Sequence, residues 1–207
     1  MLIKICGLKY ADNIRALGTY PIDMMGFIFY PKSPRFIDGE FEISTIKYLP
    51  NDIKKVGVFV NQSFEEILSK QLLFQLDFIQ LHGDENEQFC KRIKDLNMGV
   101  IKAFQIDENF DFSILKKYQE LCDYYLFDTK TSGYGGSGKA FDWSILNQYA
   151  LSTPFLLSGG IGLENIDEAL SFYHSQLAGF DINSKIELEP GLKSIEMTKN
   201  ITIKIKN

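Results

Sequence analysis

Short apolar runs, rich in β-branched and aromatic residues, alternate along the chain with longer segments in which apolar residues recur every three or four positions. Runs of the first kind predict β-strands, and segments of the second kind predict helices. Eight strands are predicted on this basis, over residues 2–6, 24–30, 55–60, 77–82, 99–106, 124–129, 154–158 and 177–182. Seven helices are predicted between them, over residues 11–20, 41–49, 63–74, 86–96, 113–121, 142–150 and 165–174.

This alternation predicts the fold class. Strand and helix alternate about eight times over 207 residues, and no long Pro-, Gly- or Ser-rich linker interrupts them. We therefore predict an α/β protein, a (β/α)8 TIM barrel that forms a single domain over residues 1–207. A doubly wound open sheet gives the same local pattern, but such sheets more often have about five or six strands. The tail 201–207 alternates like a strand, yet the eighth unit of a barrel needs a helix, so we expect one from about Ser194.

Polar residues stand at the ends of several predicted strands. These ends carry Cys6, His82, Asp128, Ser158-Gly159-Gly160 and Asp181. In a TIM barrel the active site lies on the loops that follow the strands, so polar residues at these ends are candidate site residues. Side chains alternate along a strand, which places Lys4 on the same face as Cys6 and Gln80 on the same face as His82. The opposite faces are strongly apolar, so the polar faces are predicted to point into the barrel.

Cys6 has two interpretations. A free cysteine is usually a small buried apolar residue, but its position at a strand end favours a place in a site. The chain has three scattered cysteines and no recognisable signal peptide, which predicts reduced thiols in the cytoplasm. Cys90 and Cys122 fall in or near predicted helices and are expected in the core.

Two turns near the end of the chain are candidates for a phosphate site. The segment LLSGGIGLENI (156–166) joins a strand to a helix through Gly159 and Gly160, whose backbone N–H groups can approach an anion closely. The segment FDINSKIELEPG (180–191) offers Asn183 and Ser184 as donors after the last strand. Turns after the seventh and eighth strands form the usual phosphate site of a barrel. Each could be only a tight turn, but the pair favours phosphate.

A third glycine-rich segment, GYGGSGKA (133–140), has the spacing of a nucleotide P-loop. Ala140 stands where that motif needs a hydroxyl for magnesium. We predict instead a glycine-rich lid that closes over the site.

Four further residues can carry chemistry or binding. Asp128 is either a salt-bridge partner of Lys130 or a proton donor, which a partly desolvated site would keep protonated. Asp181 offers a second carboxylate. His82 either binds a substrate or caps the segment after it. Arg35, in the loop after the second strand, suits a carboxylate or a phosphate, although a solvated charge is the ordinary role of such a residue.

Composition excludes several classes of partner. The net charge is −5, from 22 Lys and Arg and 27 Asp and Glu, and no basic run or zinc-type spacing supports nucleic-acid or metal binding. The longest apolar stretches are strand-sized, too short to span a bilayer. A small phosphorylated molecule is the expected partner.

Ordered segments over nearly the whole chain resemble one known family, phosphoribosylanthranilate isomerase. The segments that carry this resemblance are KICGLK, GFIFYPKSPRFI, VGVFVNQ, IQLHGDE, FDTK, GGSGKAFDW, LSGGIGLENI and DINSKIELEPGLK. The resemblance implies a cofactor-free Amadori rearrangement in tryptophan biosynthesis. N-(5-phosphoribosyl)anthranilate would become 1-(2-carboxyphenylamino)-1-deoxyribulose 5-phosphate, in a monomer or homodimer that needs no metal.

The resemblance also implies roles for site residues. Asp128 would be the general acid that opens the ribose ring, and Cys6 the base that removes the C2′ proton. Substrate would be bound by Arg35, His82 and Asp181, and its phosphate by Gly159, Gly160, Asn183 and Ser184. For Cys6 to act as a base, its thiol pKa must come toward neutrality, and Lys4 nearby is a candidate to lower it.

Two departures and two rival functions stay open. Many relatives have a Gly-Val-Glu run where this chain has Lys185-Ile186-Glu187, and Ser194 replaces an acid after PGLK. The charge of Lys185 either assists phosphate binding or faces solvent. An indole-glycerol phosphate synthase is the rival with the same fold, although its lysine and glutamate set has no match at these strand ends. A catalytically silent barrel that binds a phosphorylated ligand is the rival of another class, and the histidine-pathway aminoaldose is an open second substrate.

Overall fold

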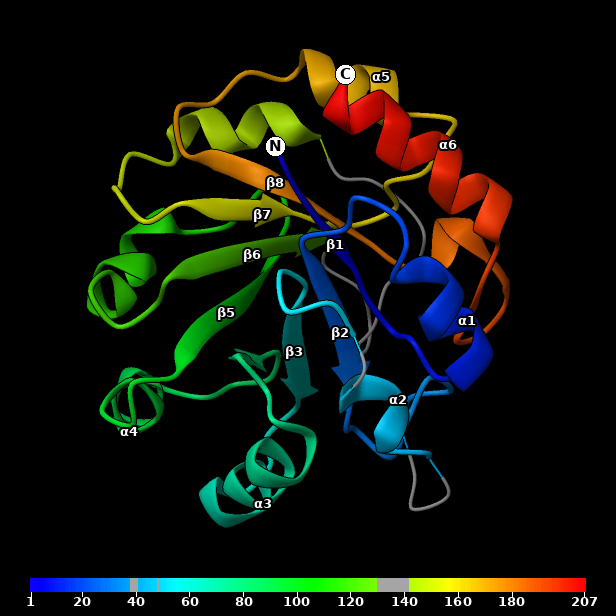
Figure 1. The fold of residues 1–207 in the computed structure, drawn as a ribbon. Coiled ribbons are helices and arrows are strands. Elements are labelled where there is room, and N and C mark those ends of the chain that lie inside the picture. Colours follow the sequence, from blue (N-terminus) through cyan, green and yellow to red (C-terminus); the bar gives the residue numbers. More distant parts are fainter. Residues whose placement is uncertain (38–40, 48, 130–141) are drawn as a thin grey trace.

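The structure is a computed structural model that describes residues 1–37, 41–47, 49–129 and 142–207. Its eight parallel strands close into a barrel in the order β1 to β8, which confirms the predicted (β/α)8 fold (Figure 1). The strands are β1 (Leu2–Ile5), β2 (Met24–Ile28), β3 (Lys54–Phe59), β4 (Phe78–Leu81), β5 (Gly99–Ile106), β6 (Tyr124–Thr129), β7 (Phe155–Leu157) and β8 (Leu177–Ile182). The predicted lid (133–140) and Lys130 lie outside the described residues.

Helices surround the ring of strands in Figure 1. The α-helices are α1 (Ala11–Leu17), α2 (Ser44–Lys47), α3 (Phe64–Phe74), α4 (Glu87–Lys94), α5 (Ile166–Ser171) and α6 (Ile195–Lys206). The fifth and sixth predicted helices are short 3-10 helices, η1 (Phe112–Tyr118) and η2 (Trp143–Gln148). Each follows an aspartate, Asp111 or Asp142, whose carboxylate accepts a hydrogen bond from a backbone N–H of the first turn at 2.9 Å. Apolar residues three apart suit both kinds of helix, so the pattern did not distinguish them.

The two faces of each strand divide as predicted. Facing the barrel axis is a small apolar cluster formed by Met24, Val56, Ile101, Ala103, Leu126 and Leu156. Residues of the other parity, such as Phe127 and Phe180, pack in the larger cluster between barrel and helices. Asp128 follows Leu126 by two positions and therefore shares its inward face. Apolar side chains fill the barrel below, and polar side chains lie above them at the carboxyl ends of the strands.

The chain's last helix is α6, and its start is set by Ser194. The Ser194 hydroxyl accepts a hydrogen bond from the backbone N–H of Met197 at 3.2 Å, which confirms the predicted helix start. Ile201 and Ile205 are buried, whereas Ile203 is exposed, because residues four apart share a helical face. The isoleucine alternation that resembled a strand is thus a helix with one buried stripe.

A short hairpin after β8 was not predicted. The 3-10 helix η3 (Ser184–Ile186) leads into β9 (Glu187–Glu189), which pairs antiparallel with β10 (Leu192–Lys193). Gly191 turns the chain with a positive φ of 91°, a conformation that glycine adopts without strain. The hairpin brings Glu187 and Lys193 back beneath the loop that follows β8.

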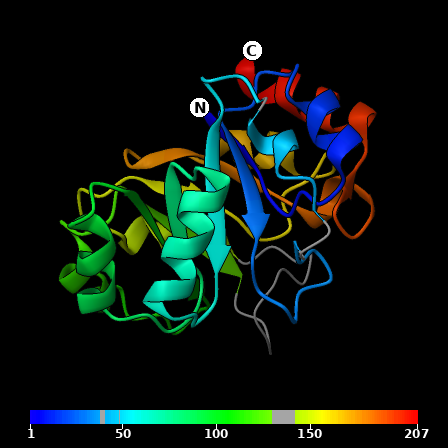
Figure 2. The ribbon, with the colours of Figure 1, turned by 60° about the horizontal axis from the view of Figure 1, so that its bottom comes forward.

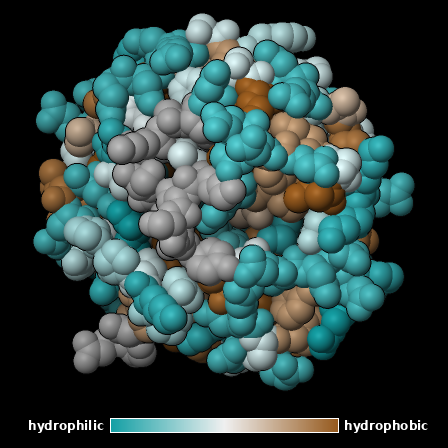
Figure 3. Space-filling model, turned by 180° about the vertical axis from the view of Figure 1, so that it is seen from behind, coloured by the Kyte–Doolittle hydropathy of each residue, from teal (hydrophilic) through white to brown (hydrophobic). Residues whose placement is uncertain are grey.

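Parallel pairing places all strand ends together. In Figure 2, blue β2 and cyan β3 run side by side with their arrowheads at the same end. Seen from behind in Figure 3, hydrophilic side chains cover much of the surface between smaller groups of apolar ones. The most exposed large apolar residues are Tyr173, Leu72 and Leu188, which lie on separate parts of the chain, as is normal for a protein surface. Within the described ranges, no helix has the length and apolarity to cross a membrane.

Candidate active site

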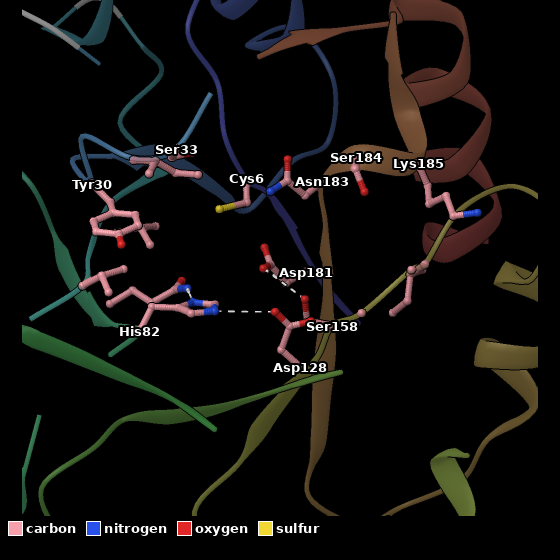
Figure 4. Close-up of a pocket in the computed structure, with 17 residues that line it drawn as sticks. Cys6, Tyr30, Ser33, His82, Asp128, Ser158, Asp181, Asn183, Ser184 and Lys185 are labelled. Carbon is pink, nitrogen blue, oxygen red and sulfur yellow. Dashed lines mark hydrogen bonds and ion pairs between the residues drawn. The ribbon is translucent and has the colours of Figure 1, made fainter. Parts of the chain in front are cut away.

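A pocket opens at the carboxyl ends of the strands and holds most of the predicted site residues. Eight of the nine line it, namely Cys6, His82, Asp128, Gly159, Gly160, Asp181, Asn183 and Ser184. Figure 4 shows Cys6 reaching into this pocket from one side and Asp128 from another, with Asp181 between them in that view. Arg35 is the ninth residue and does not line the pocket. Residues far apart in sequence therefore meet where the barrel fold predicts a site.

Cys6 is both buried and part of the site. The residue is only 3% exposed, but it lines the pocket. Its strand position is fixed by a hydrogen bond from its backbone N–H to the carbonyl of Ile182 at 2.9 Å. Gly26 on β2 leaves room for the thiol, since a Cβ at that position would lie 2.8 Å from Sγ. Cys6 is thus a buried residue, as the first interpretation expects, and also part of the site, as the second expects.

The electrostatics of Cys6 differ from the sequence-based expectation. Burial raises the pKa of the Cys6 thiol above its ordinary value of 9.0, and the positive charge of Lys4 opposes this without reversing it. The negative charge of Asp181 adds to the rise. Lys4 therefore lowers the thiol pKa as expected, but not enough to bring it toward neutrality in the ligand-free protein. Lys4 is already paired, and desolvation of the thiolate outweighs its effect.

Lys4 and Asp181 form a buried ion pair at the floor of the pocket. Strands β1 and β8 pair with Lys4 opposite Asp181, and Nζ donates to Oδ1 at 2.7 Å. Ser158 at the end of β7 donates to Oδ2 at 3.5 Å. Burial acts to lower the pKa of Lys4, but the charge of Asp181 raises it overall, so the lysine stays charged. Removing one member of such a pair leaves an uncompensated charge.

Asp128 lies at the end of a chain of polar side chains. Its Oδ1 accepts a hydrogen bond from the backbone N–H of Thr129 at 2.9 Å, and its Oδ2 lies 3.5 Å from Nε2 of His82 (Figure 4). On the other side of the ring, the amide nitrogen of Gln80 donates to Nδ1 of His82 at 2.8 Å. An Nδ1 that accepts leaves the ring proton on Nε2, facing Asp128. Such contacts are often long in ligand-free sites and shorten when substrate binds.

Gln80 should therefore fix the tautomer of His82. The chain has two histidines, and His174 is a built-in reference, because its Nδ1 accepts from the backbone N–H of Gln176 at 3.1 Å. In 15N NMR of histidine-labelled protein, both rings are expected in the Nε2–H form. Gln80→Leu should shift the nitrogen resonances of His82 and leave those of His174 in place. Unchanged His82 resonances in the variant would contradict this assignment.

The predicted phosphate turns have the backbone geometry that glycine permits. Gly159 and Gly160 have positive φ values of 91° and 71°. Asn165 fastens this turn, since its side chain donates to the carbonyl of Gly160 at 3.0 Å and accepts from the backbone N–H of Gly162 at 2.9 Å. Any residue with a side chain would have a strained backbone at these two positions. With glycine at both, no side chain stands between the backbone of the turn and the pocket.

Arg35 is held by a carboxylate that the sequence analysis did not consider. Its Nε and Nη2 donate to both oxygens of Glu187 at 2.6–3.1 Å. Lys193 also donates to Glu187 at 2.7 Å and to Oδ1 of Asn183 at 2.7 Å. Burial lowers the pKa of Lys193 to about 8 in spite of the charge of Glu187. This network joins the loop after β2 to the predicted phosphate turn after β8.

Glu187→Gln should destabilise the fold, because it leaves Arg35 and Lys193 without their shared carboxylate. We expect a loss of about 3 kcal/mol in unfolding free energy at neutral pH. Burial alone would raise the pKa of Glu187, but Arg35 and Lys193 lower it overall. Its contribution is therefore present above the ordinary value of 4.5 and lost as pH falls through the lowered pKa.

Denaturant unfolding of the wild type and the variant between neutral and acidic pH measures this effect. The difference between the two proteins should shrink on acidification. Asp167→Asn is the control, because Asp167 forms an exposed pair with Lys204 that should contribute no more than about 1 kcal/mol. A Glu187→Gln variant no less stable than this control would contradict the role of Glu187.

Cys90 and Cys122 lie in the core as expected, and His174 makes a structural contact as well. Cys90 and Cys122 are buried, and all three cysteines are free. His174 follows α5 and donates through Nε2 to the carbonyl of Tyr149 at 3.0 Å. In the described part of the chain, no group of three or more His, Cys, Asp and Glu side chains has an arrangement that could hold a metal ion.

Ser158 was a candidate because it stands at a strand end, but its contact with Asp181 was not predicted. The pair of Glu187 and Lys193 was not predicted either. Glu187 and Lys193 gave no such signal, because their contacts depend on a hairpin that the pattern did not predict.

A closed parallel barrel with two carboxylates, a thiol and an imidazole around one pocket at its carboxyl ends defines a (β/α)8-barrel enzyme. The chain belongs to the N-(5′-phosphoribosyl)anthranilate isomerase family, whose model, described as N-(5'phosphoribosyl)anthranilate (PRA) isomerase, matches residues 3–204.

Individual relatives agree with this assignment. The N-(5′-phosphoribosyl)anthranilate isomerase of Parabacteroides distasonis is 45% identical over 203 residues, which cover 97% of this chain and 91% of that protein. The crystal structure of the Thermotoga maritima phosphoribosyl anthranilate isomerase superposes with a TM-score of 0.85 at 35% identity, covering 99% of this chain and 97% of that one. Another isomerase, solved with reduced 1-(o-carboxyphenylamino)-1-deoxyribulose 5-phosphate, has a TM-score of 0.84 at 30% identity, covering 100% and 98%.

Proposed function

We propose that this protein catalyses the Amadori rearrangement of N-(5-phosphoribosyl)anthranilate to 1-(2-carboxyphenylamino)-1-deoxyribulose 5-phosphate, with Asp128 as general acid and Cys6 as general base. The observation that carries the proposal is that both side chains line one pocket although they lie on β6 and at the end of β1. Moving a proton between neighbouring carbons needs an acid and a base around one substrate, and these residues supply both.

The acid step opens the sugar. Asp128 gives its proton to the ribose ring oxygen, the bond from C1′ to that oxygen breaks, and the anthranilate nitrogen lone pair forms a protonated Schiff base with C1′. His82, 3.5 Å from Oδ2 of Asp128, is in place to bind the opened sugar or to orient the carboxyl group. The backbone N–H of Thr129 holds the other oxygen, so Oδ2 is the one left to act.

The base step forms the new double bond. Cys6 as thiolate takes the C2′ proton, the electron pair of that bond joins C1′ and C2′, and the Schiff-base nitrogen becomes neutral. The enolamine then loses the proton of its C2′ hydroxyl and gains one at C1′ to give the ketose. Asp128 has lost one proton and Cys6 has gained one, so exchange with water restores the starting state of the protein.

The remaining predicted residues anchor the substrate. The turns of Gly159-Gly160 and Asn183-Ser184 would bind the phosphate through backbone and side-chain donors. Asp181, fixed by Lys4, would accept from a sugar hydroxyl. Arg35 would bind the anthranilate carboxylate through Nη1, which makes no hydrogen bond to the described residues. Glu187 would orient Arg35 for this contact.

Turnover of chemically generated phosphoribosylanthranilate tests the proposal. The anthranilate-type fluorescence of the substrate should fall with time in proportion to enzyme concentration. Binding of the substrate without conversion would instead support the silent binding barrel. The same assay with the histidine-pathway aminoaldose tests the second substrate. A monomer or homodimer, and a location in the cytoplasm, stay predictions.

A further inference from the structure

One cation lines the pocket and has no place in the mechanism. Lys185 is the single Lys or Arg among the lining residues that the structure describes, and it follows directly on Asn183 and Ser184. Two carboxylates, Asp128 and Asp181, line the same pocket. A phosphate group that enters this pocket therefore meets negative side chains and one positive side chain.

Three other cations in the described part of the chain lie close to the pocket and are already paired. These pairs are Lys4 with Asp181 at 2.7 Å, Arg35 with Glu187 at 2.6 Å and Lys193 with Glu187 at 2.7 Å. All five side chains are buried or nearly so. Breaking a buried pair is strongly unfavourable, so none of these cations can leave its carboxylate for a phosphate group without loss elsewhere.

Lys185 differs because its pair is exposed. Its Nζ donates to Oε1 of Glu164 at 2.6 Å, and the two side chains are 34% and 55% exposed. Glu164 follows the glycine turn after β7, whereas Lys185 follows the turn after β8, so the pair spans the two predicted phosphate turns. Figure 4 shows the ammonium group of Lys185 at the edge of the pocket, directed away from Cys6 in that view.

Gly162 brings the pair close to the glycine turn. A Cβ at Gly162 would lie 2.7 Å from Cβ of Lys185 and 2.7 Å from Oε2 of Glu164. The two turns therefore pack directly on each other at this point. The hydrogen bond from Lys185 also holds the pKa of Glu164 below its ordinary value, which keeps the carboxylate charged and the pair intact in the ligand-free state.

We propose that Lys185 is a phosphate ligand that exchanges Glu164 for the phosphate group of the substrate. This rests on the phosphate subsite of the proposed function. An exposed ion pair contributes little net stability, so Lys185 can leave Glu164 at a small cost in free energy. A phosphate monoester carries a charge of about −1.5 to −2 at neutral pH, which makes it a stronger partner than one carboxylate. The flexible aliphatic part of the lysine side chain allows its ammonium group to move from Glu164 to the phosphate group.

A set of variants tests the exchange with inorganic phosphate as the probe. The variants are Lys185→Ala, Glu164→Gln, the double variant, and Lys204→Ala as the matched control. Lys204 forms an exposed pair of the same length, 2.6 Å, with Asp167, away from the pocket. The dissociation constant of phosphate is measured by 31P NMR at low and high salt, and KM and kcat are measured for the phosphorylated substrate.

Lys185→Ala should weaken phosphate binding about tenfold at low salt and less at high salt, with the loss in substrate turnover falling on KM. Glu164→Gln should strengthen phosphate binding about two- to threefold, because Lys185 loses its competing partner. Adding Glu164→Gln to Lys185→Ala should strengthen phosphate binding less than adding it to the wild type. Lys204→Ala should bind phosphate as the wild type does.

Two results would overturn the proposal. The first is that Lys185→Ala binds phosphate as tightly as Lys204→Ala does, which would mean that Lys185 faces solvent and does not contact phosphate. Glu164→Gln could weaken phosphate binding as much as Lys185→Ala, which would show that the pair acts only as a tie between the turns. Phosphate binding is measured without turnover, so a protein that fails to isomerise the substrate still gives a decisive result here.

Discussion

Cys6→Ala should lower kcat by a factor of about 10²–10⁴ and leave the fold intact. The variant removes the only group that the mechanism provides to take the C2′ proton. The substitution leaves a cavity the size of one sulfur atom beside Gly26, so the loss of stability should be small compared with the loss of activity. Cys90→Ala is the control, because it removes an equally buried thiol outside the pocket and should leave kcat unchanged. A Cys6→Ala variant with the activity of Cys90→Ala would remove Cys6 from the mechanism.

The pH dependence gives a second readout of the same residue. Burial raises the pKa of Cys6 above 9.0, so at neutral pH the thiolate is the minor form. Its fraction grows about tenfold for each pH unit below that pKa, so the ultraviolet absorbance of the Cys6 thiolate should rise between neutral and alkaline pH. The difference in absorbance between the wild type and Cys6→Ala isolates this signal from the other thiols and tyrosines. A Cys6 thiolate signal that is already complete at neutral pH would contradict the raised pKa.

Asp128→Asn should lower kcat by a similar factor, about 10²–10⁴, because an amide of the same shape has no proton of suitable acidity to give to the ring oxygen. The amide oxygen can still accept the hydrogen bond from Thr129, so the side chain should keep its place. The loss should appear in kcat, since the phosphate and anthranilate contacts remain. If the loss appeared in KM alone, Asp128 would be a binding residue and the acid would have to be sought elsewhere.

The barrel could be predicted because each strand repeats the same physical pattern. Leu126 and Asp128 share one face of β6 and Phe127 lies on the other, so the alternation alone predicts that polar strand ends face the pocket. Helix type was less accessible, since residues 113–121 satisfy the spacing of both α and 3-10 helices. The pattern also could not show that 187–193 folds back as a hairpin, because its two strands are only three and two residues long.

The residues of the site could be predicted from the sequence, but their contacts with one another could not. Strand ends identified Cys6 and Asp128, whereas the partner of Arg35 is Glu187, which lies 152 positions further along the chain. The pKa of Cys6 could not be predicted either. Sequence places Lys4 beside it, but whether charge or burial prevails depends on the ion pair of Lys4 with Asp181, which only the closed barrel creates.

The most direct test of this mechanism is a crystal structure with reduced 1-(o-carboxyphenylamino)-1-deoxyribulose 5-phosphate bound. Sγ of Cys6 should lie in contact with C2′. The carboxyl group of Asp128 should lie about 2.6–3.2 Å from the former ring oxygen. A ligand whose C2′ faces neither side chain, or whose ring oxygen lies beyond the reach of Asp128, would contradict the assignment of acid and base.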